Sequence, residues 1–235
     1  MNSIVVTGGS GTIGGAIVNS LINEGYKVWN IDISEPTNDI DKQIFLKGDV
    51  TNYSELKRLI HDNLQYEDIV GVITVAGGGV AEEWENFVDV DIEAVKKSID
   101  LNLLGHINVV HILMPYLVRN KSNKSIIMIS SINGKAAYKL AGYSAAKAGL
   151  EGFMYGVVKE FGENNIRINI ISPGTVVSEL TMNEEKKDWE SLRMGTITGK
   201  FVSPKDIAQL AILITKNESI DGQNMIIDSG QSIKK

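Results

Sequence analysis

The stretch TGGSGTIGGAIVNSLINEG, residues 7–25, joins a short apolar run to an amphipathic pattern through a turn rich in glycine. Gly8, Gly11 and Gly14 permit a tight turn there, and they let backbone N–H groups approach a pyrophosphate at the start of a helix. The same turn is also compatible with a plain connection between a strand and a helix, so the residues that follow have to separate the two interpretations.

Asp32 ends the next expected strand, YKVWNID, 18 residues after Gly14. In dinucleotide-binding folds, the acid that contacts the adenine ribose lies about 20 residues beyond such a loop. A carboxylate there accepts hydrogen bonds from both ribose hydroxyls and repels a 2′-phosphate. Neither the glycine loop nor the following DISEP carries Arg or Lys. We therefore expect NAD in preference to NADP, with a simple turn residue at a strand end as the alternative for Asp32.

The expected dinucleotide site extends to the end of the third expected strand. GDV at 48–50 places Asp49 and Val50 where they could border an adenine pocket, and Asp49 as the cap of a turn or helix is the alternative. The loop residues expected to contact the dinucleotide are Gly8, Ser10, Gly11, Thr12, Ile13 and Gly14.

Short β-branched runs alternate along the whole chain with longer amphipathic stretches. The expected strands are 4–7, 27–31, 44–47, 71–75, 125–130, 167–171 and 224–227. Several are almost entirely apolar, which is typical of strands buried on both faces of a parallel sheet. The stretches between them repeat apolar residues at helical spacing. This order predicts an α/β fold: a Rossmann-like, doubly wound, seven-stranded parallel sheet flanked by helices on both faces.

The composition is that of an ordinary globular protein, with 43% hydrophobic and 22% charged residues among 235. No linker interrupts it, so we expect a single domain over residues 1–235. The net charge of −6 predicts neither nucleic acid nor a membrane surface as a partner. With no cysteine and three scattered histidines, no metal site is expected. The start, MNSIVVTGG, lacks the pattern of a signal peptide, so a cytoplasmic location is expected.

YSAAK at 143–147 places Tyr143 and Lys147 four residues apart, on the same face of a helix. A nearby ammonium favours phenolate, so we expect it to lower the pKa of Tyr143. Tyr143 would then serve as a general acid or base near neutral pH. A core tyrosine beside a surface lysine is the alternative.

The segment IIMISSING at 126–134 supplies hydroxyls upstream of that pair. It reads as a buried strand that ends in Ser130 and Ser131. In open α/β sheets the carboxyl end of a strand borders the crevice where ligands bind. A serine hydroxyl at this position could hydrogen-bond a substrate carbonyl.

Taken together, these motifs resemble the short-chain dehydrogenase/reductase family, small single-domain type, over nearly all of the chain. TGGSGTIG matches its glycine loop, SIDLNLLG its helix asparagine, ISSING its serine segment and RINIISPG its sixth strand with the Pro-Gly loop. YSAAK matches its acid–base pair, and DGQNMIIDSG resembles its last strand.

The resemblance implies a role for each matching residue. Tyr143 would exchange a proton with the substrate oxygen, Lys147 would hydrogen-bond the nicotinamide ribose, and Asn102 would hold a water in a proton relay, with a core asparagine as the alternative. Ser131 matches the substrate-orienting serine better than Ser130, although Ser130 fits the spacing too. The resemblance implies that Tyr143 and Lys147 also contact the cofactor, with Ala76, Gly77, Pro173, Gly174, Val176 and Ser178.

Two positions and the length of one connection depart from the family pattern. Val75 stands where the family has the asparagine of Asn-Ala-Gly, and Thr12 stands where it usually has a second glycine. The Thr12 spacing resembles the larger sugar-nucleotide branch of the superfamily, but we expect no counterpart of that branch's C-terminal substrate domain and therefore expect the smaller type. Only about a dozen residues follow Asp32 before the third strand, so we expect a loop rather than a helix in that connection.

The expected function is hydride transfer between a nicotinamide cofactor and a secondary alcohol or ketone. An isomerase or dehydratase that oxidises its substrate transiently and a non-catalytic dinucleotide sensor are the alternatives. Residues 179–201 are expected to form a lid over the cleft, with Met182, Trp189, Leu192 and Met194 as possible contacts. Trp84 is a candidate on the opposite wall, whereas Glu82, Glu83 and Glu85 are expected to face solvent. The resemblance implies a homodimer or homotetramer, built on the helices that begin near Val90 and Tyr143.

Overall fold

A computed structural model describes residues 2–37, 41–136, 140–176 and 189–233 and contains one seven-stranded sheet. The strands are β1 (Ser3–Thr7), β2 (Lys27–Asp32), β3 (Gln43–Lys47), β4 (Ile69–Thr74), β5 (Lys124–Ile129), β6 (Ile166–Pro173) and β7 (Asn224–Ile227). Their order in space is β3-β2-β1-β4-β5-β6-β7, and every pairing is parallel. The predicted doubly wound sheet is confirmed. The first and last residues of each predicted strand lie within about two residues of the observed boundaries.

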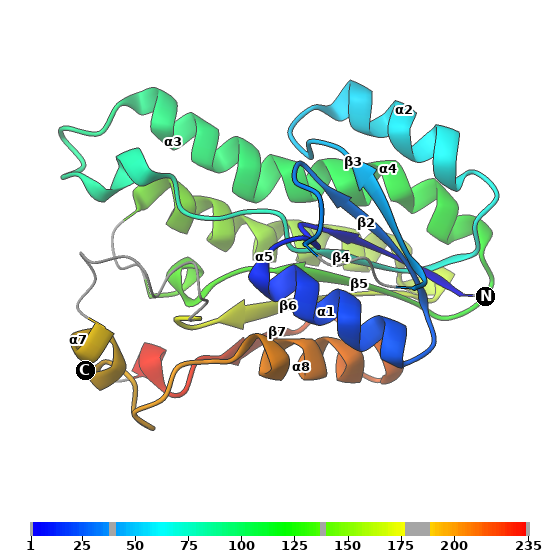
Figure 1. Ribbon diagram of the computed structural model, residues 1–235. Coiled ribbons are helices and arrows are strands. Elements are labelled where there is room, and N and C mark those ends of the chain that lie inside the picture. Colours follow the sequence, from blue (N-terminus) through cyan, green and yellow to red (C-terminus); the bar gives the residue numbers. More distant parts are fainter. Residues whose placement is uncertain (1, 38–40, 137–139, 177–188, 234–235) are drawn as a thin grey trace.

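Helices cover both faces of this sheet (Figure 1). On one face, α1 (Thr12–Asn23) and α8 (Pro204–Lys216) pack side by side against the sheet around Ile17, Val18, Leu21 and Ile207. On the other face lie α2 (Tyr53–Leu64), α4 (Gly105–Arg119) and α5 (Ala141–Phe161), with α3 (Ile92–Ile99) packed on α5. The two apolar clusters are separate because each belongs to one face of the sheet.

The central strands are buried along their whole length, which explains their nearly continuous apolar sequences. Every residue of β4, β5 and β6 is buried. Burying one large aliphatic side chain contributes about 1.5–3 kcal/mol, so these three strands supply much of the stabilising burial. The β2–β3 connection contains no helix in its described residues, 33–37 and 41–42, as the short sequence predicted.

The longest helical run is 92–119, in which α3 continues through the single π-helical turn η2 (Asp100–Leu104) into α4. By length and composition alone, this run could cross a membrane. Half of its most apolar window is buried inside the protein, as expected for a helix of the core. Val109, Leu113 and Leu117 belong to that core.

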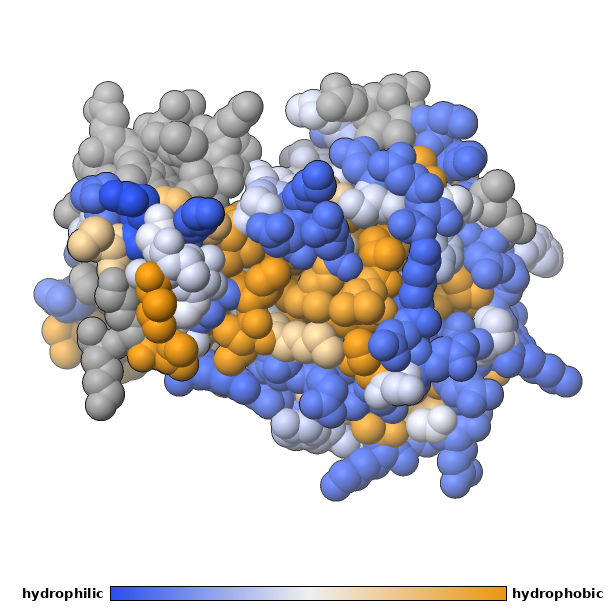
Figure 2. Space-filling view, turned by 90° about the horizontal axis from the view of Figure 1, so that it is seen from below, coloured by the Kyte–Doolittle hydropathy of each residue, from blue (hydrophilic) through white to orange (hydrophobic). Residues whose placement is uncertain are grey.

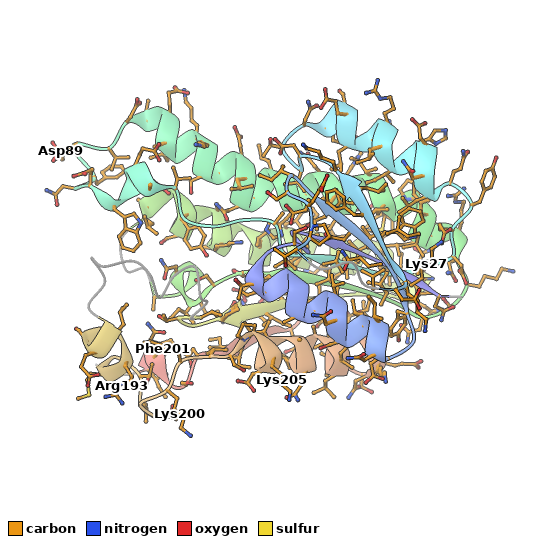
Figure 3. All side chains as sticks on the ribbon, viewed as in Figure 1. Lys27, Asp89, Arg193, Lys200, Phe201 and Lys205 are labelled. Atoms are coloured by element: carbon orange, nitrogen blue, oxygen red, sulfur yellow. The ribbon has the colours of Figure 1, made fainter. Side chains whose placement is uncertain are left out.

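The spatial order of the strands reverses between β1 and β4, and the crevice at such a point, beyond the carboxyl ends of the strands, is where open α/β sheets bind ligands. Figure 3 shows Lys27, the first residue of β2, at one end of the molecule, and Asp89 and Arg193 at the opposite end. The segments that carry Asp89 and Arg193 therefore lie at the end where the strands finish.

An apolar area lies on the face seen in Figure 2, over α8 and the edge strand β7. The large apolar side chains that these two elements expose are Leu213, at 52%, and Ile226, at 41%. An edge strand also presents unpaired backbone groups. This face is therefore chemically suited to contact another protein surface.

A polar cluster forms at the other end of the sheet, around the half-buried carboxylate of Glu67. This carboxylate accepts hydrogen bonds from Lys27 Nζ at 2.8 Å, Ser3 Oγ at 2.8 Å and Trp29 Nε1 at 3.4 Å. Burial raises the pKa of Glu67, but these hydrogen bonds and the Lys27 charge outweigh it and hold the pKa below 4.5. The ionised carboxylate is thus stabilised more in the folded than in the unfolded chain.

We predict that Glu67→Gln lowers the free energy of unfolding by about 1 kcal/mol at neutral pH, because it removes a charged acceptor from three donors. Because the folded pKa is depressed, this contribution is complete above pH 4.5 and is lost as the pH falls through the folded pKa. Urea unfolding of both proteins across this range measures the difference. Glu24→Gln, in the exposed ion pair with Lys216, is the matched control and should cost less. An equal loss in both variants, or a loss that does not depend on pH, would contradict this assignment.

Candidate functional site

The glycine loop between β1 and α1 is packed so closely that side chains are excluded at several of its positions. Gly8 has a φ of +71°, and a Cβ there would lie 2.6 Å from the nitrogen of Ala76. A Cβ on Gly14 would lie 2.0 Å from the oxygen of Gly8. Helix α1 then starts at Thr12 with no side-chain cap at Gly11 and no acidic residue in its first turn. The exposed Gly11 and Thr12 thus lie at an uncapped helix N-terminus that suits an anionic ligand.

Asp32 lies beside this loop, as the sequence predicted. Its carboxylate accepts hydrogen bonds from the backbone nitrogens of Ser10 and Ser34, both at 3.0 Å. From β2, the buried Asn30 donates to Ser10 Oγ at 3.2 Å, and a Cβ on Gly9 would collide with Asn30. Asn30 and Asp32, both on β2, therefore fix the course of the loop. Asp32 is only partly buried.

Asp49 and Val50 both have structural contacts. Asp49 Oδ1 accepts hydrogen bonds from the backbone nitrogen and the hydroxyl of Thr51, at 2.8 and 2.7 Å. Asp49 therefore caps a turn, which was the alternative interpretation of this residue. The side chain of Val50 is buried and packs where a Cβ on Gly105 would lie. Its backbone oxygen accepts from Asn108.

The turn after β4 passes directly under the glycine loop. The nitrogens of Val75 and Ala76 both donate to the oxygen of Thr7 at 3.1 Å. Val75 therefore leaves the course of the backbone intact, even though the side-chain amide of the family pattern is missing. Gly77 is exposed beside it.

Asn102 lies in the π-helical turn η2 and is fully buried. Its Oδ1 accepts from the nitrogen of Gly78 at 2.9 Å, and its Nδ2 donates to the oxygens of Gly78 and Ser98 at 2.9 and 3.0 Å. Single π-helical turns are frequent at functional sites. The side chain joins the turn after β4 to the long helix, close to Lys147, since a Cβ on Gly77 would lie 2.6 Å from Asn102 Oδ1 and 3.3 Å from Lys147 Nζ.

The two serines at the end of β5 have different partners. Ser131 lines a pocket, and its side chain acts to lower the pKa of Tyr143. Ser130 is buried, and its Oγ donates to the backbone oxygen of Lys147 at 3.0 Å. Ser131 thus faces the pocket, whereas Ser130 contacts helix α5.

Tyr143 and Lys147 lie one turn apart on α5, with Lys147 Nζ 5.7 Å from the centre of the tyrosine ring. The prediction that Lys147 lowers the pKa of Tyr143 is wrong for this structure. Burial raises the pKa of Tyr143, and the Ser131 side chain offsets only part of that effect. Burial also lowers the pKa of Lys147 to about 7, so its charge is partial at neutral pH. The phenol is therefore protonated at neutral pH.

Lys147 is 4% exposed, and its Nζ has two partners. It donates to the backbone oxygen of Ile129 at 2.9 Å and lies 3.4 Å from Nε2 of His106. His106 lies about one helical turn after Asn102, and it was not predicted as a site residue. The spacing of four residues from Asn102 was the available signal, because it places both on one helix face.

Glu83, which we expected to face solvent with Glu82 and Glu85, is buried, whereas the other two are exposed. Glu83 lies in the 3-10 turn η1 (Ala81–Trp84), and its carboxylate accepts from the nitrogens of Gly142 and Tyr143 at 2.7 and 3.3 Å. It thereby caps the N-terminus of α5, where Leu140 has no side-chain cap. Glu83 lies 59 and 60 positions before its two partners in the chain, so no local sequence pattern signals these contacts.

A pocket of about 570 Å³ opens beside Ser131. It is bounded by η1, by the turn after β5, by the loop after β6, by α7 (Trp189–Met194) and by the C-terminal turn η5 (Gln231–Ile233). The lining residues are Trp84, Ser131, Ile132, Asn133, Leu140, Gly174, Thr175, Ser191, Leu192, Met194, Gly195 and Gln231. Trp84, Leu192 and Met194, each named from the sequence, thus lie in the wall; Met182 and Ser178 lie outside the described residues, as does the first part of the expected lid.

The loop after β6 is held by the C-terminal segment. Gly174 follows Pro173 and lies so close to Asp228 that a Cβ would be 2.8 Å from Asp228 Cβ. Gln231 Oε1 accepts from Thr175 N at 2.9 Å, and Gln231 Nε2 donates to Thr175 Oγ1 at 3.0 Å. Val176 pairs with Val202 as an isolated bridge. Gln231, which sequence reasoning missed, therefore shapes the pocket wall.

The residues present fit a nicotinamide dinucleotide. The uncapped start of α1 can receive its pyrophosphate, and Asp32 can receive a ribose diol. The exposed Gly77 then leads to the pair formed by Lys147 and Tyr143, since a Cβ on Gly77 would lie 3.3 Å from Lys147 Nζ. The sequence profile described as short chain dehydrogenase matches residues 2–189. The chain belongs to the short-chain dehydrogenase family. It is accordingly an NAD(P)-dependent oxidoreductase, as the motifs predicted.

Several family members align with the whole chain. The NAD-dependent glycerol dehydrogenase of Listeria innocua is 28% identical over 244 residues, which cover 98% of this chain and 93% of that protein. Carbonyl reductase family member 4 of Xenopus laevis is 27% identical, with coverage of 96% and 95%. The crystal structure of a short chain dehydrogenase family protein from Francisella tularensis has a TM-score of 0.88 at 25% identity, with 99% of each chain covered.

We predict that Glu83→Ala destabilises this dehydrogenase by about 1–3 kcal/mol, because one buried and one partly buried N–H group of α5 lose their acceptor. The start of the helix carries Tyr143, so kcat should fall as well. Chemical denaturation and steady-state kinetics measure the two effects. Glu82→Ala, at the exposed neighbouring position, is the matched control and should leave both quantities unchanged. Equal behaviour of the two variants would contradict the capping role.

Proposed function

We propose that the enzyme catalyses reversible hydride transfer to or from a secondary alcohol or ketone, with Tyr143 as the general acid or base. The observation that carries this proposal is the position of Ser131, which lines the pocket and whose side chain acts on the Tyr143 phenol, with Lys147 one turn further along α5. A carbonyl or hydroxyl oxygen within reach of both hydroxyls could be oriented by Ser131 and exchange a proton with Tyr143.

When bound, the nicotinamide cofactor supplies the hydride chemistry. The residues of this chain bind and orient the reactants and handle the proton. Because burial keeps the Tyr143 phenol protonated at neutral pH, it is ready to donate a proton to a carbonyl oxygen during reduction. Oxidation needs the phenolate, so its rate should rise toward alkaline pH.

The pocket wall favours a small neutral substrate with a polar and an apolar side. Ser131, Asn133 and Gln231 supply polar groups, whereas Trp84, Leu192 and Met194 supply apolar area. The activities for which two relatives are named, NAD-dependent glycerol dehydrogenase and carbonyl reductase, support the same substrate class. An isomerase that oxidises transiently would give no net NADH, and a dinucleotide sensor would give no turnover.

We predict that Tyr143→Phe lowers kcat by about 10²–10⁴-fold, the usual contribution of a positioned acid or base. Dinucleotide binding and thermal stability should remain, since the ring stays in place. The assay follows reduced-nicotinamide absorbance with a panel of secondary alcohols and ketones. Tyr155→Phe removes a hydroxyl from an exposed position of the same helix and is the control. Full turnover by Tyr143→Phe would refute the assignment.

For the cofactor we propose NAD in preference to NADP, on the basis of the Asp32 carboxylate. The glycine loop, residues 8–14, and the segment that directly follows Asp32, residues 33–37, contain no Arg or Lys that could neutralise a 2′-phosphate. The glycerol dehydrogenase relative is named as NAD-dependent, which agrees with this proposal.

We predict that Asp32→Ala combined with Ile33→Arg raises the ratio of kcat/KM with NADP to kcat/KM with NAD at least about tenfold, which corresponds to about 1.4 kcal/mol. The double change removes a repulsive carboxylate and adds a guanidinium at an exposed position. Asp62→Ala on α2 is the charge-matched control. An unchanged ratio would show that Asp32 does not read the ribose.

Self-association is also part of this proposal, because family members of this kind act as oligomers. Exposed apolar side chains on the α3–α4 run, Ile92, Leu104 and Val118, and Tyr155 on α5 support contacts through the helices named from the sequence. The apolar area over α8 and β7 is a second candidate surface (Figure 2).

A further inference from the structure

Thr175 and Gln231 form a hydrogen-bonded pair in the wall of the pocket beside Ser131. Thr175 lies in the loop after β6, and Gln231 lies in the C-terminal turn η5, so the pair joins two segments that are far apart in the chain. In Figure 1 the C-terminal turn lies beside α7, at the end of the molecule where the strands finish. Both side chains are therefore placed to contact a molecule bound in the pocket.

The side-chain amide of Gln231 has one orientation that satisfies both of its contacts with Thr175. Its Oε1 lies 2.9 Å from the backbone nitrogen of Thr175, and its Nε2 lies 3.0 Å from Thr175 Oγ1. A backbone N–H and an amide NH2 both donate and neither accepts, so the reverse orientation would set two donors against each other. Oε1 therefore faces the backbone nitrogen, and Nε2 donates to the threonine hydroxyl.

This orientation determines what the Thr175 hydroxyl offers to a ligand. A hydroxyl carries one proton to donate and two lone pairs, and here a lone pair is used by Gln231. The backbone groups of Thr175 are paired as well, the nitrogen with Gln231 and the oxygen with the nitrogen of Val202 at 3.2 Å. Among the residues that the structure describes, none accepts the hydroxyl proton. Thr175 thus presents a hydrogen-bond donor in the pocket wall.

Gln231 is held in place by the turn to which it belongs. It is buried, and its backbone nitrogen donates to the oxygen of Asp228 at 3.0 Å. The Asp228 carboxylate in turn accepts from the backbone nitrogens of Gly230 and Ser232, at 2.9 and 2.7 Å. A Cβ on Gly174 would lie 2.9 Å from Gln231 Oε1, so the loop after β6 packs directly against the amide. An amide fixed in this way holds the threonine hydroxyl in one direction.

We propose that Thr175 is a substrate-binding residue that donates a hydrogen bond to a second oxygen atom of the substrate, and that Gln231 is the positioning residue that directs this donor. The substrate class is accordingly an alcohol or ketone with a further ether, hydroxyl or carbonyl oxygen. The proposal rests on the proposed function, in which Ser131 and Tyr143 hold the reacting oxygen. Ser131 follows β5 and Thr175 follows β6, so the two oxygens of the substrate are held by different segments.

The first test compares the reduction of matched ketones by the cofactor-loaded enzyme. Methoxyacetone and its carbon isostere, methyl propyl ketone, differ in one oxygen atom, and an ether oxygen only accepts hydrogen bonds. A second pair, with one more methylene between the carbonyl and the ether, covers another spacing of the two oxygens. We expect Thr175→Val to lower the ratio of kcat/KM for the ether to kcat/KM for the isostere by about threefold to tenfold, the usual value of one neutral hydrogen bond. The intrinsic reactivity of the ketones cancels when this ratio is compared between variants.

Two further threonine variants show whether the hydroxyl of this position is responsible. Thr175→Ser keeps the hydroxyl and its contact with Gln231, so it should keep the ratio of the unmodified enzyme. Thr215→Val removes a hydroxyl that bonds the backbone of Ala211 on α8, and it is the matched control. An unchanged ratio for both ketone pairs in Thr175→Val would overturn the proposal. So would weaker dinucleotide binding in that variant without a change in the ratio, because the donor would then serve the cofactor.

The second test reverses the hydrogen bond between the two side chains. A carboxylate only accepts, so in Gln231→Glu at about pH 8 one oxygen keeps the contact with the Thr175 nitrogen and the other accepts the hydroxyl proton. Both contacts remain, but the donor is turned away from the pocket, and the added charge acts on both ketones of a pair alike. The ratio should therefore fall as in Thr175→Val, and the double variant should lower it no further. An unaltered ratio in Gln231→Glu, or a further fall in the double variant, would overturn the positioning role.

The failure of this inference can be told apart from the failure of the proposed function. Absence of turnover with every ketone and alcohol would count against the dehydrogenase proposal, and ligand-observed NMR with the dinucleotide-loaded protein then compares binding of the same ketone pairs. A preference for the ether that Thr175→Val removes would support the inference, whereas a preference that this variant leaves unchanged would overturn it. Turnover with the same ratio in all variants would overturn the inference and leave the dehydrogenase activity intact.

Discussion

Two reciprocal hydrogen bonds join helix α5 to the end of strand β5, and the geometry of the site depends on them. Lys147 Nζ donates to the backbone oxygen of Ile129, and Ser130 Oγ donates to the backbone oxygen of Lys147. Each side chain thus binds the backbone of the other element. The pair is buried, so water does not compete for these bonds, and together they fix the distance between the serine segment and the tyrosine.

That contact explains why the neighbouring residues are so small. A Cβ on Gly134 would lie 3.0 Å from the backbone of Lys147 and Ala148, so the turn after β5 lies directly on the helix. Gly142 is equally constrained, because a Cβ there would lie 2.4 Å from the Glu83 carboxylate. The small residues around YSAAK are therefore required by the close approach of β5, η1 and α5, and that approach brings Ser131 to Tyr143.

The sequence predicted the fold and the cofactor loop well because both depend on local patterns. Apolar runs located every strand, and the glycines, Asp32 and the YSAAK pair were found from spacing within one or two elements. Glu83 and His106 were missed because their roles depend on elements far apart in the chain, η1 with α5 and α4 with α5. The pKa of Tyr143 was predicted in the wrong direction for a related reason: the sequence shows that a lysine is near but not that burial acts more strongly on both groups.

Burying Lys147 works against folding, and the sign of that effect bears on the design of the site. The unfolded lysine keeps its proton up to about pH 10.5, whereas the folded one loses it near pH 7. Between these values the unfolded chain binds more protons at this residue, so its contribution to stability increases as pH rises and is least favourable below pH 7. A stability optimum alone would select an apolar residue here. The retained amine, with its Ile129 and His106 partners, is thus best explained by the chemistry at Tyr143. The Tyr143 hydroxyl has to give up and recover a proton while the groups that hold the substrate oxygen stay in place.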